Sequence, residues 1–238
     1  MTMQFGITRE TACGYLQDQN ERLIVAVPDQ QCAMNTERYQ YLLQHGFRRS
    51  HNDVYRPYCR LCQACQSIRV LANEFSYSKN QRRVINNNKD LVRRTVQQPA
   101  ADYSALFCQF IEQRHRDGGM YPPDAEGFWY WCDCDWMTPE YIEWRDADQN
   151  LVMVSVIDAV PDALSAMYTF FHPQLAARSL GTYAILQLID LCQQRNKDYL
   201  YLGYQIDECQ KMNYKARFTP NERLIGNHWQ KAVKSTKR

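Results

Sequence analysis

The sequence lacks a long hydrophobic run, and we therefore expect no membrane-spanning segment and no membrane partner. Its longest apolar stretch, residues 151–160, is interrupted by Ser155 and Asp158 and is far shorter than the roughly 20 residues that a transmembrane helix needs. The N-terminal residues also lack a charged segment followed by an apolar one. A secretion signal is therefore not expected, and the predicted location is cytoplasmic.

Low-complexity segments and internal repeats are also missing, and the composition excludes disorder as the main state. Of 238 residues, 23% are charged and 45% are apolar, which is typical of a globular protein. This length predicts one large or two modest domains. We expect the ten cysteines to be reduced, and in a reduced protein cysteine pairs indicate a metal site, catalysis or burial.

A strong net charge is absent too, because the total is only +2, but the charges are segregated along the chain. Residues 56–94 contain nine basic and two acidic residues, residues 117–148 nine acidic and one basic, and residues 211–238 eight basic and one acidic. Two basic regions that flank an acidic one indicate a positive surface for a polyanion. Merely solvated faces would give the same pattern.

The order of elements predicts an α+β protein with a boundary at residue 98. A helix capped by Asn35 or Thr36 is expected in the first part. Proline and small residues at 97–101 then separate two different patterns. We assign 1–98 to a smaller N-terminal α+β domain, basic and cysteine-containing, and 99–238 to a second domain.

A cationic helix is predicted shortly before this boundary. Ser78 and Gln81 have the spacing of a capping box, and the helix that they begin places Lys79, Arg82 and Arg83 on one face. Basic groups spaced by about one helical turn repel one another unless an anion lies against them. A phosphate backbone is a suitable partner, although exposure to water would also relieve the repulsion.

The second domain shows the element order of the GCN5-related N-acetyltransferases. Two β-rich runs, 151–157 and 164–171, predict an antiparallel hairpin, which a helix at 180–195 and a strand at 199–204 follow. This hairpin, helix and strand order predicts a mixed sheet of the acetyltransferase type.

The turn that opens the predicted helix at 180–195 is a candidate anion site. It contains Arg178, Gly181 and Thr182. Backbone amides at the start of a helix carry partial positive charge and bind anions, and a glycine permits close approach. An ordinary helix start with a packing glycine is the alternative.

Cys59, Cys62 and Cys65 form a C-x-x-C-x-x-C segment, with Cys13 or His51 as a possible fourth ligand. A tetrahedral metal site usually has two separated pairs, and the second pair is missing here. We therefore favour a tight turn whose cysteines pack as small apolar residues, and expect neither a metal nor a cofactor.

Five stretches of the sequence together resemble the arginyl-tRNA-protein transferase family, and within it the bacterial branch that transfers leucine to proteins beginning with aspartate or glutamate. They are YRPYCRLCQACQSIR at 55–69, SKNQRR at 78–83, RSLGTY at 178–183, YLGY at 201–204 and KMNYKARF at 211–218. The resemblance implies transfer from leucyl-tRNA to the N-terminal amine of the acceptor protein, which marks it for degradation.

Two positions depart from the family pattern. Eukaryotic members carry a Cys-Gly-Tyr-Cys motif linked to metal or iron-sulfur binding, but this chain has Leu16 in place of the second cysteine. Gln205 stands where bacterial relatives are expected to have a bulky aromatic residue. The resemblance therefore does not carry the metal site over to this chain.

Transfer from an aminoacyl ester needs no strong nucleophile on the protein. The ester is already activated and the α-amine has a pKa near 8, so the enzyme has to orient both groups, accept one proton and stabilise the oxyanion. Tyr204, at the end of the strand beside the helix, is a candidate either to donate to the oxyanion or to orient the leaving ribose oxygen. Asp207 is close enough in the sequence to be a candidate for relaying a proton.

The acceptor's side-chain carboxylate calls for a cation in a partly dry pocket. Arg56 and Arg69, which bracket the cysteines, are the first candidates. Lys211, Tyr214 and Lys215 are a second set, because a helix would place them on one face. Either set would also suit a phosphate.

Three other functions fit parts of the pattern. An arginyl donor is possible within the same family. An acyl-CoA-dependent acetyltransferase would share the fold, but coenzyme A does not need a cationic helix. A non-enzymatic RNA-binding module would leave the turn at 178–183 unexplained.

Overall fold

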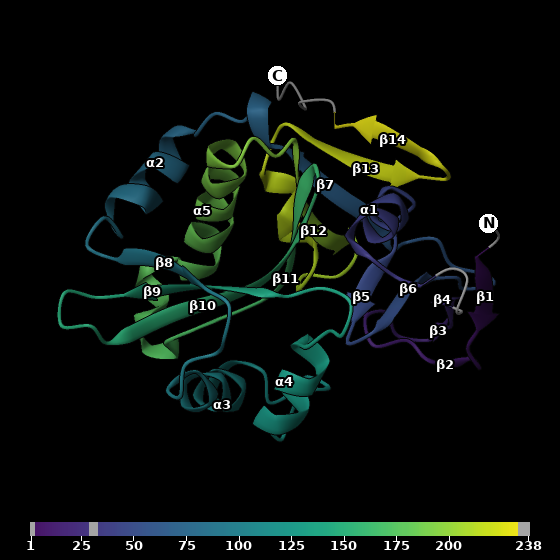
Figure 1. Cartoon of the computed structure of the whole chain (residues 1–238), viewed down its shortest axis with the longest axis horizontal. Coiled ribbons are helices and arrows are strands. Elements are labelled where there is room, and N and C mark those ends of the chain that lie inside the picture. Colours follow the sequence, from purple (N-terminus) through teal and green to yellow (C-terminus); the bar gives the residue numbers. More distant parts are fainter. Residues whose placement is uncertain (1–2, 29–32, 233–238) are drawn as a thin grey trace.

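The computed structural model describes residues 3–28 and 33–232, which form two larger sheets and a short two-stranded one (Figure 1). The eight-stranded sheet has the order β14-β13-β7-β12-β11-β10-β9-β8, and the four-stranded sheet has the order β1-β4-β6-β5. The α+β class predicted from the sequence is therefore confirmed. In the described part of the chain, no helix combines the length and the apolar character needed to cross a bilayer.

The large sheet collects strands from most of the chain. Its members are β7 (Gln66–Leu71), β8 (Val92–Val96), β9 (Glu140–Arg145), β10 (Leu151–Val160), β11 (Ala163–Phe171), β12 (Tyr199–Gln205), β13 (Asn221–Ile225) and β14 (His228–Lys231). The predicted hairpin is present as β10 and β11, joined by a short turn at Pro161 and Asp162. Strands β11 and β12 are parallel, and all other pairs in this sheet are antiparallel.

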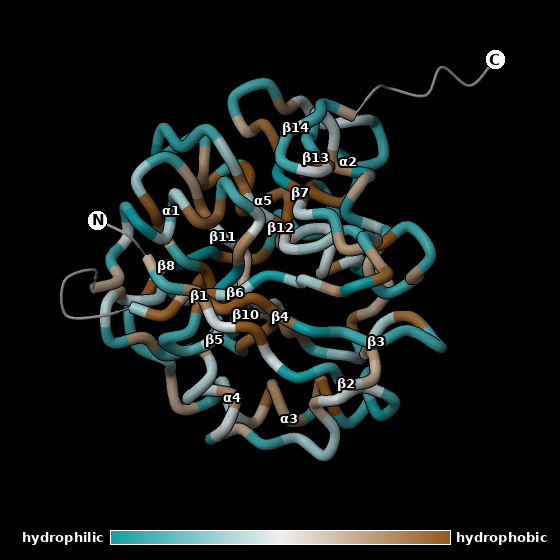
Figure 2. The backbone as a smooth tube through the Cα atoms, turned by 90° about the vertical axis from the view of Figure 1, so that its right-hand side faces the viewer, coloured by the Kyte–Doolittle hydropathy of each residue, from teal (hydrophilic) through white to brown (hydrophobic). Residues whose placement is uncertain are grey.

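Helices cover both faces of the large sheet (Figure 1). They are α1 (Thr36–Gln44), α2 (Lys79–Asn86), α3 (Tyr103–Arg114), α4 (Ala125–Cys132) and α5 (Leu180–Gln194), with 3-10 turns at Ala72–Glu74, Pro173–Arg178 and Asn213–Arg217. One apolar core lies under α5 and α2, and a second lies between α3, α4 and strands β10 and β11. Figure 2 shows the hydrophobic segments, in brown, concentrated toward the middle of the molecule.

The small sheet is formed by the start of the chain. It contains β1 (Gln4–Ile7), β4 (Leu23–Val27), β5 (Arg48–Ser50) and β6 (Asp53–Pro57), and the short pair β2 (Thr11–Ala12) and β3 (Asn20–Glu21) lies beside it. Asn35 caps α1 by accepting a hydrogen bond from the Arg38 amide at 2.9 Å, which selects Asn35 from the two predicted caps. Helix α1 packs on the end of β10 and places the small sheet against the large one.

A buried ionic group joins the two sheets. Arg49 of β5 pairs with Asp158 of β10 at 2.7 Å, and neither side chain is exposed. The hydroxyl of Tyr39 on α1 donates to the same carboxylate at 3.1 Å. Removing one partner of such a buried pair typically costs about 3–5 kcal/mol, because the other charge is left unpaired.

The predicted boundary at residue 98 does not coincide with a division between the sheets. Strands β7 and β8 precede it, yet β7 lies between β12 and β13, and β8 pairs with β9. The first 98 residues therefore supply two strands of the sheet that was assigned to the second domain. Long-range pairing of this kind leaves no local signal in the sequence.

Candidate active site

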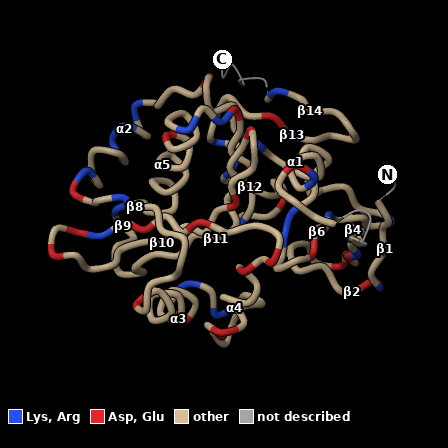
Figure 3. The backbone as a smooth tube through the Cα atoms, in the orientation of Figure 1, with Lys and Arg blue, Asp and Glu red and all other residues tan. Residues whose placement is uncertain are grey.

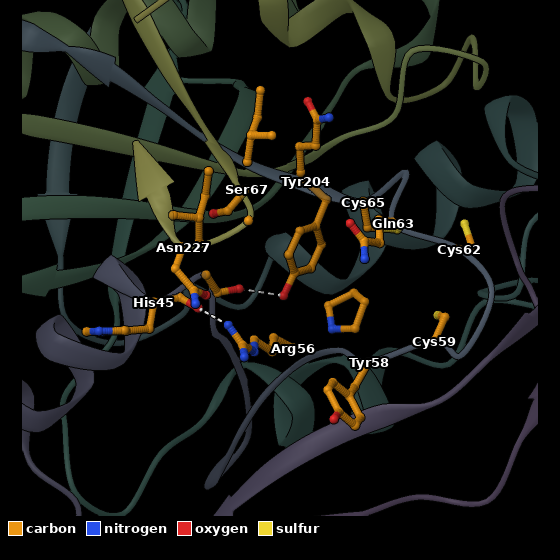
Figure 4. Close-up of a pocket in the computed structure, with 16 residues that line it drawn as sticks. His45, Arg56, Tyr58, Cys59, Cys62, Gln63, Cys65, Ser67, Tyr204 and Asn227 are labelled. Carbon is orange, nitrogen blue, oxygen red and sulfur yellow. Dashed lines mark hydrogen bonds between the residues drawn. The ribbon is translucent and has the colours of Figure 1, made fainter. Parts of the chain in front are cut away.

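A cavity of about 400 Å³ opens where the small sheet meets β7, β12 and the β13–β14 turn (Figure 4). Its walls come from segments far apart in the sequence, which meet only in the folded chain. They include His45, Gly46, Arg56, Tyr58, Cys59, Cys62, Gln63, Cys65, Ser67, Tyr204 and Asn227. We call this space the Arg56 cavity.

Arg56 is the cationic residue of this wall. It lies on β6, where its guanidinium donates to the His45 carbonyl at 2.8 Å and stands 5.1 Å from the centre of the Phe47 ring. Its Nε is buried but has no hydrogen-bond partner, and it forms no ion pair with a described carboxylate. A half-buried guanidinium without a carboxylate partner is suited to bind an anion.

Ser67 supplies a second unused polar group in the same cavity. Its side chain is only 3% exposed, and its Oγ has no hydrogen-bond partner among the described residues. A buried hydroxyl without a partner costs free energy until a ligand or water satisfies it. Ser67 and Arg56 together therefore make this cavity a polar binding site.

Tyr204 stands in the middle of the cavity wall (Figure 4). Its hydroxyl donates to the Gly46 carbonyl at 3.0 Å. Burial raises its pKa well above the usual value, so the hydroxyl stays protonated. Gly46 has a φ of +83°, and a Cβ there would approach the Leu224 side chain to 2.8 Å. The glycine therefore permits both the turn after α1 and the contact with Tyr204.

Lys215 holds the backbone of Tyr204 from the opposite side. Its Nζ donates to the Tyr204 carbonyl at 2.6 Å, and the side chain is 6% exposed. Burial is the main cause that lowers the Lys215 pKa to about 7, and the nearby charge of Arg48 adds to it. The pairing of β12 with β7 is irregular between Tyr201 and Tyr204, and Gly203 with a φ of +80° accommodates this change.

Asp207 lies just beyond the end of β12. It forms an ion pair with Arg223 at 2.8 Å and accepts a hydrogen bond from Gln205 at 2.7 Å. The hydrogen bond from Arg223 is the main cause that lowers the Asp207 pKa. A carboxylate stabilised in this way is a weak proton acceptor. The Gln205 side chain also accepts from the Ala216 amide, so this residue anchors the following loop and does not line the cavity.

The structure separates the predicted acceptor-binding residues. Arg69 bonds Glu222 through Nε at 2.8 Å, and its guanidinium lies between the rings of Tyr199 and Trp229. Lys211 pairs with Asp117 on the surface. Of the predicted set, only Arg56 lines the cavity.

The predicted helical face at Lys211, Tyr214 and Lys215 is wrong. The chain turns at Lys211 and then forms a 3-10 helix over Asn213–Arg217, so no α-helical face exists there. Tyr214 is exposed whereas Lys215 is buried. The lysine-tyrosine spacing alone did not distinguish a helix from a turn.

The predicted donor-binding residues lie close together. Helix α2 packs on α5, and the Arg178 guanidinium bonds Asn88 and Asp90 just after α2. Gly181 and Thr182 are the second and third residues of α5. A Cβ on Gly181 would lie 3.5 Å from the Phe171 ring, an ordinary contact, so a side chain fits there without a clash.

Helix α2 has the predicted capping box between Ser78 and Gln81. Lys79, Arg82 and Arg83 are exposed, and the opposite side of the helix packs on the core beneath α5. Figure 3 shows basic residues along α2, beside the start of β8. The cationic face predicted from the sequence is therefore present on the surface.

The cysteine segment forms part of the cavity wall. Cys59, Cys62 and Cys65 are free thiols, and burial raises the pKa of Cys65 to about 12. Within residues 3–28 and 33–232, no three cysteine, histidine, aspartate or glutamate side chains converge to hold a metal ion. These cysteines act here as lining residues.

Sequence reasoning missed Ser67, Tyr58 and His45, which also line the cavity. Ser67 and Tyr58 fall inside the stretch 55–69 that carries the resemblance, but nothing in that stretch marks which side chains point inward. His45 follows the end of α1 and contributes its carbonyl. A residue that contributes only a backbone group cannot be recognised from the type of its side chain.

Two family models match most of the chain. The model described as "Arginine-tRNA-protein transferase, N terminus" matches residues 11–83, and the model described as "Arginine-tRNA-protein transferase, C terminus" matches residues 102–225. These matches cover strands β4, β5 and β6 of the small sheet and the greater part of the large sheet.

Similar proteins extend over nearly the full length. A protein named aspartate/glutamate leucyltransferase from Pseudoalteromonas atlantica is 46% identical over 96% of this chain and 97% of its own length. Proteins of the same name from Aeromonas hydrophila and Vibrio cholerae are 42% and 39% identical over 95% of this chain, covering 94% and 96% of their own lengths.

Among solved structures, the chain is similar to FemX with a TM-score of 0.47 and 7% identity, covering 88% of this chain and 82% of FemX. It is also similar to the C-terminal domain of a putative lysylphosphatidylglycerol synthetase from Agrobacterium fabrum, with a TM-score of 0.46 and 8% identity, covering 83% of this chain and 71% of that chain.

Proposed function

The chain belongs to the arginine-tRNA-protein transferase family, and from this premise we propose that it transfers leucine from leucyl-tRNA to the N-terminal amine of proteins that begin with aspartate or glutamate. Identity of up to 46% over nearly the whole length to proteins named for this activity is the observation that carries the proposal. The product would mark the acceptor for degradation. Every described cysteine is free, which suits a reducing compartment such as the cytoplasm.

We assign the Arg56 cavity to the acceptor's side chain. The half-buried guanidinium of Arg56 and the hydroxyl of Ser67 both line this cavity, and we expect them to donate to the carboxylate. A neutral asparagine or alanine would leave the guanidinium without a counter-charge, which makes binding much weaker. This arrangement therefore favours aspartate and glutamate at the acceptor's first position.

The transfer step needs orientation more than strong acid or base chemistry. The neutral α-amine attacks the carbonyl carbon of the leucyl ester, a carbon–nitrogen bond forms, and the bond to the ribose oxygen breaks. The amine proton ends on that ribose oxygen, which leaves free tRNA. Because the Tyr204 hydroxyl remains protonated, it is available as a donor to the developing oxyanion once it turns from the Gly46 carbonyl.

We assign the donor's phosphates to α2 and the start of α5. Lys79, Arg82 and Arg83 are exposed along α2, and the first amides of α5 lie beside it. Strands β11 and β12 pair in parallel only at their beginnings, where Ala163–Ser165 lies beside Tyr199–Tyr201. The separation of these two parallel strands beyond Ser165 and Tyr201 supports a sheet of the GCN5-related N-acetyltransferase type.

The activity is tested with labelled leucyl-tRNA, arginyl-tRNA and acetyl-CoA, each offered with peptides that begin with Asp, Glu, Asn or Ala. We expect leucine on the Asp and Glu peptides only. Preferred use of arginyl-tRNA or acetyl-CoA would contradict the proposed donor, and equal labelling of Asn peptides would contradict the proposed acceptor.

Replacing Arg56 by methionine tests the acceptor assignment. We expect kcat/KM for Asp peptides to fall about 30-fold or more, the equivalent of about 2 kcal/mol, because the carboxylate loses its guanidinium partner. Arg60→Met is the matched control, since Arg60 is exposed in the same segment and does not line the cavity. An Arg56→Met enzyme that still prefers Asp to Asn would refute the assignment.

A further inference from the structure

A second cavity of about 450 Å³ lies directly beside the Arg56 cavity. The two cavities have Pro57, the three cysteines of residues 59–65 and Tyr204 as common lining. Tyr204 is only 9% exposed, and its ring belongs to both walls. One tyrosine and one cysteine segment therefore separate two spaces of nearly equal size.

The second cavity differs from the first in its chemistry. Leu16, Leu23, Val25 and Ile206 contribute aliphatic side chains, and none of the described lysines and arginines lines it. Burial raises the pKa values of Tyr15 and Cys65 to about 12, so these two groups remain neutral. Together with the aliphatic side chains, they make much of the wall apolar.

Two carboxylates and the polar side chains of Thr8, Asn20 and Ser50 also line this cavity. Asp53 is exposed, and the Glu21 carboxylate accepts a hydrogen bond from the Gly14 amide at 3.3 Å. The volume falls in the usual range of about 300–1,000 Å³ for small-ligand pockets, which are mainly apolar with few polar groups. The part of the wall formed by Leu16, Leu23, Val25 and Ile206 is therefore suited to an aliphatic group.

Amide transfer brings two side chains close together. The attacking amine and the ester carbonyl must meet at about 3–3.5 Å, so the side chains of acceptor and donor have to occupy neighbouring pockets. The Arg56 cavity suits the acidic side chain. We propose that the second cavity holds the aliphatic side chain of the transferred amino acid, with Tyr204 between the two. This inference rests on the proposed leucyl transfer.

Two cavity-filling variants test the inference. Leu16→Trp changes a turn residue and Val25→Phe changes β4, and each adds bulk where the leucyl side chain would lie. We expect kcat/KM for leucyl-tRNA to fall about tenfold or more relative to alanyl-tRNA, because a smaller side chain still fits. Val27→Phe is the control, since Val27 lies on the same strand, is 43% exposed and does not line the cavity.

The readouts separate this inference from the proposed function. Wild-type protein that transfers no leucine would refute the proposed function. Wild-type transfer with an unchanged leucyl-to-alanyl ratio in both variants would refute the inference alone, provided circular dichroism shows that they fold. If Val25→Phe fails to fold, Leu16→Trp alone tests the inference. Leu16 lies outside the described strands, so its replacement does not disturb a strand. A third outcome is a variant that keeps the leucyl-to-alanyl ratio but changes its preference for the second residue of the acceptor peptide. That result would show that the cavity binds the acceptor and would overturn the inference.

Discussion

Lys215 couples the stability of the protein to pH. Its folded pKa is about 7 and the ordinary value is 10.5, so between these pH values the unfolded chain binds the proton that the folded chain does not. Its contribution to the free energy of unfolding therefore rises with pH across this window, by up to about 1.4 kcal/mol per unit. Below pH 7 the cost of burying the charged amine is fully present.

Urea unfolding of wild-type protein and Lys215→Met at pH 7.5 and 9.5 measures this contribution. We expect the wild-type stability minus the variant stability to increase by about 2 kcal/mol between the two pH values. Taking this difference cancels the thiol and tyrosine titrations that both proteins share. Lys211→Met, whose side chain is exposed, is the control. A constant difference would mean that Lys215 keeps its proton in the folded chain.

The sequence identified the candidate cationic residues but not the groups that each of them contacts. Arg56 and Arg69 lie in one matching stretch, yet Arg56 keeps an unused donor in a cavity while Arg69 is occupied by Glu222. The difference depends on Glu222 and Trp229, which reach Arg69 only when β13 and β14 join the sheet. Long-range neighbours of this kind cannot be inferred from local spacing.

The basic residues of helix α2 are expected to bind the phosphates of the tRNA. Reversing Arg82 and Arg83 to glutamate should weaken leucyl-tRNA binding and flatten its dependence on salt. Each lost phosphate contact removes about 0.7–0.9 from the slope of log affinity against log salt. Folding should survive, because both side chains are exposed and Val84 and Ile85 make the contact with the core. Filter binding at several salt concentrations measures the slope.

Arg9→Glu with Arg60→Glu is the control for α2, because it makes the same change in net charge at exposed positions outside the helix. If the control and the α2 variant give the same affinity and slope, total charge governs the binding and the assignment of α2 is wrong. A reduced slope confined to the α2 variant would support a phosphate track on this helix.

Elements with a strong local pattern were predicted correctly. The β-rich runs at 151–157 and 164–171 gave the hairpin of β10 and β11, and the capping box gave α2, because these signals are complete within a few residues. Helix α4 was missed. Its residues are aromatic on several sides, since it packs against α3 and the sheet at once, and this hides the helical period.

At the scale of the whole molecule, the 99–238 segment should not fold alone. Without residues 1–98, strand β12 loses β7 on one side, β9 loses β8, and Asp158 loses its partner Arg49. We expect this fragment to be insoluble or to lack a cooperative thermal transition, whereas the full chain unfolds in one transition. Circular dichroism on both proteins makes the comparison. A stably folded fragment would support a domain boundary at residue 98.

Strand β7 is synthesised long before the strands that it pairs with. Its two neighbours in the sheet, β12 and β13, are among the last segments to leave the ribosome. At usual rates of synthesis, on the order of ten seconds pass between the synthesis of β7 and that of its partners. During this time both edges of β7 are unpaired, and Ile68 and Val70 are exposed to water. The nascent chain is therefore most exposed to aggregation in this interval, when chaperones are the partners that it needs.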